Sequence, residues 1–153
     1  MNIMHLINPN LTLNASTVVL LLQSAAVLHL GLLWAGLSMP RAVGLGGHLA
    51  PLPSFIRNLF YVYYGFIGLT LIAFGLFTYF FAAPMAHGEP VARALCVFMT
   101  VFWLVRLAAA LWLFDVRPYL RNGFLRAGYM GLNAVFIYLI VVYGYVAWRG
   151  GTP

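Results

Sequence analysis

Long apolar segments alternate with short polar stretches along this chain. The apolar segments cover residues 17–39, 54–82, 91–114 and 124–148, and the stretches between them, rich in glycine, proline and arginine, are expected to be loops. A helix needs about 20 apolar residues to cross the hydrocarbon core of a bilayer, so each segment is long enough. The pattern predicts an all-α integral membrane protein, a four-helix bundle that forms one domain over residues 1–153.

Small residues recur on one face of the second segment. Gly65, Gly68 and Gly75 are spaced so that a helix brings them to the same side, and Gly31 and Ala35 form a similar pair in the first segment. Small side chains let helices in a membrane approach one another closely. We therefore expect these faces to pack against helices, either within the chain or on a partner.

Composition and charge exclude several classes of protein. The chain of 153 residues is 64% hydrophobic and only 7% charged, against about 25% charged residues in soluble domains. All its cations are arginine, which removes lysine Schiff-base chemistry, and Glu89 and Asp115 are its only acids, which argues against a paired-carboxylate enzyme. The net charge of +6 comes from dispersed arginines, so nucleic acid is not an expected partner.

The distribution of arginine predicts the topology. One set of loops holds Arg41, Arg57, Arg117, Arg121 and Arg126, whereas the other side holds Arg93 and Arg149. By the positive-inside rule the first set is cytoplasmic, which places both termini on the extracytoplasmic side. The expected location is the inner (plasma) membrane of a bacterium.

Arg106 lies inside the third apolar segment, between Val105 and Leu107. A charge at this depth costs roughly 2.5–3.5 kcal/mol on insertion scales. On a regular helix Asp115 would face away from Arg106, so we expect the guanidinium to meet other polar groups. Two interpretations stay open: Arg106 binds a lipid, an anionic ligand, a quinone or a partner's acid, or it has a structural role satisfied by tyrosine, asparagine, backbone or water.

Further polar side chains lie at a similar depth in the other segments. If their faces point inward, a polar cavity opens toward the cytoplasm, and its candidate ligand-binding residues are Arg106, His29, Tyr61, Tyr64, Asn133 and Tyr129. Only His29 among the histidines lies within a segment, so haem held by two histidines is not expected. We predict no bound metal and no cofactor, and the sequence identifies no catalytic residue.

Three classes of function fit these features. The first is an accessory or structural subunit of a larger membrane complex, which packs through its glycine-lined faces against other subunits or further copies of itself, with Arg106 meeting a lipid or a partner acid. The second is a small membrane enzyme or carrier that binds an anionic amphiphile, lipid or quinone. The third, a channel or transporter, is disfavoured because no segment shows a broken helix or a ring of acids.

Overall fold

The computed structural model describes residues 13–113 and 123–149. Over these ranges the chain is almost entirely helical and contains no strand, which confirms the all-α prediction. The described residues include four helices long and apolar enough to span a membrane. These are α1 (Ala15–Ala42), α3 (Ser54–Phe80), α5 (Pro90–Ala108) with its π-helical continuation η3 (Ala109–Leu113), and α6 (Gly123–Arg149).

The predicted segments coincide with these helices, but two expected loops contain short helices. The first is α2 (Leu45–Leu49), which follows Gly44 in the left-handed conformation, with φ of 62°. The second is α4 (Ala82–His87), so the turn before α5 is confined to Gly88, with φ of 73°, and Glu89. Glycine adopts a positive φ without a steric penalty, which explains both turns.

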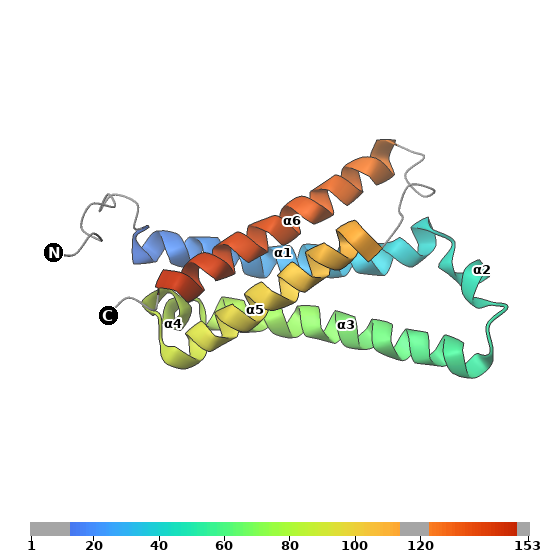
Figure 1. Cartoon of the computed structure of the whole chain (residues 1–153), viewed down its shortest axis with the longest axis horizontal. Helices are drawn as coiled ribbons and strands as arrows, with labels where there is room; N and C mark the ends of the chain where they lie inside the picture. Colours follow the sequence, from blue (N-terminus) through green and yellow to red (C-terminus); the bar gives the residue numbers. More distant parts are fainter. Residues whose placement is uncertain (1–12, 114–122, 150–153) are drawn as a thin grey trace.

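The long helices pack as two neighbouring pairs. In Figure 1, α1 runs along α3 and α5 runs along α6, and α1 also contacts α4 and α6. The start of α1, the end of α6 and α4 lie together at one end of the bundle, which we call the α4 end. At the opposite end, the α2 end, α3 and α6 point away from each other. Placement of the α4 end outside the cell stays a prediction.

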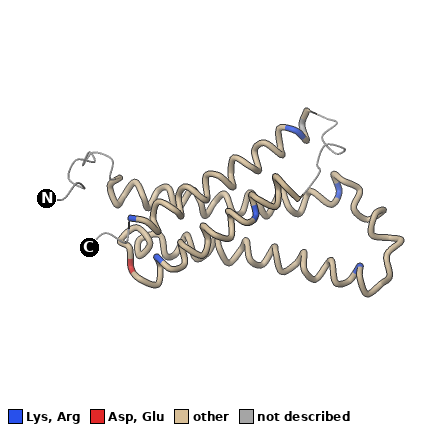
Figure 2. The backbone as a smooth tube through the Cα atoms, viewed as in Figure 1, with Lys and Arg blue, Asp and Glu red and all other residues tan. Residues whose placement is uncertain are grey.

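Charged residues lie at both ends of the bundle (Figure 2). Arg41, Arg57 and Arg126 belong to the α2-end portions of α1, α3 and α6, whereas Arg93 and Arg149 belong to the α4-end portions of α5 and α6. The structure therefore separates these arginines as the sequence predicted. The expected cytoplasmic Arg117 and Arg121, and the orientation of Asp115, lie outside the described residues.

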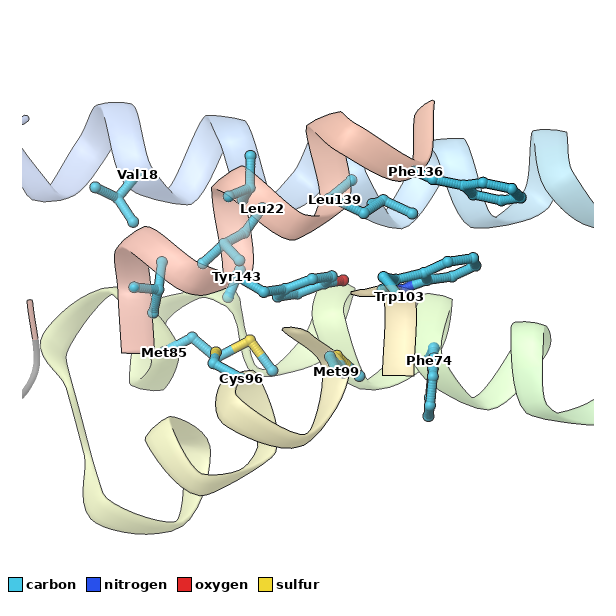
Figure 3. Close-up of a cluster of buried hydrophobic side chains, with 14 of the residues drawn as sticks. Val18, Leu22, Phe74, Met85, Cys96, Met99, Trp103, Phe136, Leu139 and Tyr143 are labelled. Atoms are coloured by element: carbon cyan, nitrogen blue, oxygen red, sulfur yellow. The ribbon is translucent and has the colours of Figure 1, made fainter. Parts of the chain in front are cut away.

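The hydrophobic core draws on all four long helices and on α4 (Figure 3). Its fully buried members include Leu22, Met85, Cys96, Met99, Leu139 and Tyr143. The helix faces that supply them have the spacing of three and four residues that places side chains on one side of a helix. On α1 that face also carries His29, which is completely buried.

The helices differ in how much of their surface the chain itself covers. In the most apolar window of each helix, 33% of α1 residues are buried but only 11% of α3 residues. None of residues 54–73 is buried. The α2-end portion of α3 therefore leaves much of its apolar surface uncovered by the rest of the chain.

Candidate functional site

His29 is the most enclosed of the predicted site residues. Its Nδ1 lies 2.7 Å from the carbonyl oxygen of Ala25, one helical turn earlier. A carbonyl only accepts, so Nδ1 carries the proton, and in the neutral ring the lone pair is on Nε2. Nε2 is buried and has no hydrogen-bond partner among the described residues. The core thus contains an acceptor that no described donor satisfies.

Aromatic rings surround the His29 imidazole. The ring centres of Trp103 on α5, Phe74 on α3 and Tyr143 on α6 lie 5.4, 6.1 and 6.2 Å from its own, all in edge-on arrangements. Trp103 Nε1, a donor only, is likewise buried without a partner among the described residues. An unsatisfied donor and an unsatisfied acceptor therefore belong to neighbouring rings in one buried aromatic cluster.

The close approach of α3 to α1 depends on Gly75. A Cβ atom on Gly75 would lie 3.3 Å from His29 Cβ and 3.4 Å from the Ala26 oxygen. Gly68 would make only an ordinary contact with Leu33, and Gly65 would meet nothing within 4 Å. On the glycine face predicted from the sequence, Gly75 therefore contacts another helix of the same chain, whereas Gly65 is open.

Hydrogen bonds between side chains join the helices beside His29. Thr78 on α3 and Tyr143 on α6 share a hydrogen bond of 2.5 Å in the core, and Ser24 on α1 shares one of 2.5 Å with the Tyr138 hydroxyl on α6. The sequence did not indicate a role for Thr78, because threonine is common in membrane helices and nothing in the spacing of Thr78 sets it apart from the residues around it. These bonds fasten α6 to both helices of the other pair.

Arg106 lies at the edge of the bundle and not in its core. Its side chain is exposed at the surface of the chain, and its guanidinium carbon lies 5.5 Å from the ring centre of Phe136. Phe136 in turn stacks on Trp103 at 5.3 Å, and the two rings lie next to each other in Figure 3. Phe136 and Trp103 thus connect the cation at the surface with His29 in the core.

Tyr129 and Asn133 lie on α6 near the end of α5. The Tyr129 hydroxyl donates to the carbonyl oxygen of Ala110 in η3 at 3.2 Å. Asn133 Nδ2 donates to the Tyr129 carbonyl at 3.0 Å, one turn back, while its Oδ1 is buried with no partner among the described residues. Tyr129 therefore provides a donor to η3, where the regular α-helical hydrogen-bond pattern changes.

Tyr61 and Tyr64 occupy a separate place on α3. The Tyr64 hydroxyl donates to the Gly36 carbonyl on α1, seven residues and thus about 10 Å along the helix from His29. Tyr61 is 50% exposed, and its ring touches that of Phe60. Tyr61 and Tyr64 thus lie apart from the other candidate residues, and the role of all six in binding a ligand stays a prediction.

The fold and this arrangement define a class: a small all-helical chain with four helices able to span a membrane and a buried aromatic cluster around one histidine. Comparison with protein-family models, with curated proteins and with solved structures gives no match.

Proposed function

We propose that this chain is an accessory subunit of a larger membrane assembly, built with other membrane proteins or with further copies of itself. The observation that carries the proposal is an exposed stripe on α3 formed by Asn58, Tyr61 and Gly65. Spacings of three and four residues place the three on one helical face. Small residues and amide or hydroxyl groups are the features through which membrane helices associate.

Gly65 supports a contact with another chain more specifically. Glycine in a helix costs about 1 kcal/mol relative to alanine. Gly75 offsets this cost through its tight contact with α1, whereas an added Cβ on Gly65 would have open space on all sides. A helix from a partner would make use of that space, because a missing side chain permits two backbones to approach closely.

The test uses the full chain, tagged and expressed at its native level and extracted in mild detergent. We expect it to purify with a stoichiometric partner or as a homo-oligomer, and Gly65→Leu to release it as a single chain with unchanged helix content. Ile67→Phe is the control, because it also enlarges an exposed residue of α3 but on the opposite face of the helix. Purification of the unmodified protein as a lone monomer would refute the proposal.

The second candidate is a membrane enzyme or carrier for an anionic amphiphile, a lipid or a quinone. It is favoured by the ring contacts that connect Arg106 with His29, whose Nε2 lone pair could accept a proton or a hydrogen bond. Mass spectrometry of small molecules that co-purify with the chain tests it. On this hypothesis Arg106→Leu and His29→Leu both lose the same molecule, while Gly65→Leu retains it.

A further inference from the structure

An open cavity of about 340 Å³ lies at the α4 end, where α5 begins. Its lining residues are Gly88, Pro90, Arg93, Ala94 and Val97. Ala94 and Val97 are exposed, so the apolar part of the lining is accessible to a ligand. The volume falls at the lower end of the range for sites that hold small ligands.

A hydrogen bond fixes the cationic side of this cavity. Arg93 is partly buried, and its Nε donates to the Ala147 carbonyl oxygen on α6 at 2.9 Å. This bond uses one of the five N–H donors of the guanidinium. The two Nη atoms of Arg93 donate to no other residue that the structure describes. Paired N–H donors of this kind match two oxygens of a phosphate group.

An acid lies next to this cation. Glu89 stands in the chain between Gly88 and Pro90, which both line the cavity. The Arg93 N–H donates to the Glu89 carbonyl oxygen at 2.8 Å, so one helical turn separates the two residues. Within the described part of the chain their side chains form no ion pair with each other, and the Glu89 side chain does not cap α5. A neighbouring cation and anion that do not pair suit a ligand that carries both charges.

An exposed apolar stripe runs along α5 from the cavity. Val97, Val101 and Leu104, which we call the α5 stripe, follow one another at spacings of four and three residues and therefore share one helical face. They are 47, 53 and 48% exposed. The rise from Arg93 to Leu104 is about 16 Å at 1.5 Å per residue, roughly half of the 30 Å hydrocarbon core of a bilayer. The α5 stripe thus extends over the depth of one leaflet.

We propose that this cavity binds the headgroup of a zwitterionic phospholipid with a primary ammonium group, such as phosphatidylethanolamine. Arg93 binds the phosphate, Glu89 accepts a hydrogen bond from the ammonium, and an acyl chain lies along the α5 stripe. The third long helix is apolar enough to span a membrane, and its first turn would then lie at the level of lipid headgroups. This proposal depends neither on the role of the chain as a subunit nor on Arg106.

The experiment measures lipid binding to the delipidated full chain in detergent by native mass spectrometry. The probes are phosphatidylethanolamine, phosphatidylcholine and phosphatidylglycerol with the same acyl chains, and glycerophosphoethanolamine, which has the headgroup without the chains. We expect phosphatidylethanolamine to bind tightest. The methylated ammonium of phosphatidylcholine has no N–H to donate to Glu89, phosphatidylglycerol has no cation, and glycerophosphoethanolamine cannot use the α5 stripe, so all three should bind more weakly.

Two variants test the charged residues. Arg93→Gln should weaken phosphatidylethanolamine binding by about tenfold or more, since hydrogen bonds to a charged group are lost. Arg57→Gln, a change of the same kind at the α2 end, should leave binding unchanged. Glu89→Gln should remove the preference for phosphatidylethanolamine over phosphatidylglycerol while phosphatidylglycerol still binds, a result that a merely structural role of Glu89 would not produce.

A third variant tests the cavity itself. Arg93→Gln also affects the bond to Ala147, whereas Ala94→Leu keeps the arginine and fills the cavity, so it should reduce phosphatidylethanolamine binding as well. Ala83→Leu is the matched control, because Ala83 is also exposed but lies on α4 and does not line this cavity.

The proposal fails if phosphatidylethanolamine binds equally to the unmodified protein, Arg93→Gln and Ala94→Leu. Equal binding of phosphatidylcholine or phosphatidylglycerol to the unmodified protein would refute recognition of the ammonium, as would an unchanged preference in Glu89→Gln. Binding of glycerophosphoethanolamine as tight as that of the lipid would show that the α5 stripe contributes nothing, and the lipid would then not be the ligand. Loss of a protein partner in Gly65→Leu bears only on the subunit proposal and leaves these outcomes unaffected.

Discussion

Replacement of Gly65, Gly68 or Gly75 on α3 by alanine should change the free energy of unfolding according to the space around each glycine. At Gly75 the added Cβ atom would lie 3.3 Å from His29 Cβ and 3.4 Å from a backbone oxygen, at Gly68 3.5 Å from a flexible leucine methyl, and at Gly65 in open space. Carbon atoms are at optimal separation at about 3.5–4.0 Å. Only Gly75→Ala therefore requires its neighbours on α1 to shift, by a few tenths of an ångström.

The expected magnitudes combine two opposing contributions. Alanine in place of glycine stabilises a helix by up to about 1 kcal/mol. Overpacking of a tight contact costs typically about 1–3 kcal/mol. Gly65→Ala should thus raise the free energy of unfolding by up to about 1 kcal/mol, whereas Gly75→Ala should lower it by up to about 2 kcal/mol, with Gly68→Ala between them.

The measurement is reversible unfolding in mixed micelles, with sodium dodecyl sulfate as denaturant and far-UV circular dichroism as the signal. The order of stability, not any single value, is the test, because all three changes have the same effect on side-chain size. If Gly75→Ala proved as stable as Gly65→Ala within about 0.5 kcal/mol, the tight contact between α1 and α3 beside His29 would be refuted.

Three further predictions concern the core. A double-mutant cycle with Thr78→Val and Tyr143→Phe should give a coupling energy of about 0.6–1.7 kcal/mol from their 2.5 Å hydrogen bond, and a coupling near zero would show that the bond does not contribute. His29→Leu should raise the free energy of unfolding by about 1 kcal/mol in detergent-purified protein, because it removes the unsatisfied Nε2; a decrease would indicate that a bound group satisfies this nitrogen. Trp103→Ala should lower the free energy of unfolding by about 3–5 kcal/mol, since Trp103 is 2% exposed and contacts both His29 and Phe136; a loss below about 1 kcal/mol would show that this cluster does not hold the helix pairs together.

The length of the apolar segments predicted the positions of the four long helices well, because a helix that crosses a bilayer needs about 20 apolar residues whatever its neighbours are. It could not locate α4, because Ala82–His87 contains Pro84 and lies next to Gly88, both of which are usual signals of a loop. Proline in the first turn of a helix lacks only an N–H that would remain unbonded there. The helix therefore tolerates Pro84, although proline at this place in the sequence predicts a loop.

The candidate site shows a different limit of sequence reasoning. Depth along each helix follows from residue number, and it led us to expect the six candidate residues at a similar level of the bundle. Rotation about the helix axis depends on packing between helices, so the sequence could not show that Arg106 lies at the edge while His29 is enclosed. Gly75 and Thr78 became informative only when the contacts of α3 with α1 and α6 were known.

The π-helical turn η3 also determines how the third long helix would respond to the insertion or deletion of one residue. A wider turn accommodates one more residue than an α-helical turn, so every side chain beyond it is rotated by about 100° relative to an uninterrupted helix. Trp112 lies within this turn and is 84% exposed. Loss or gain of one alanine within 108–110 would thus redirect the end of the third long helix, while the aromatic cluster one turn and more before it kept its register.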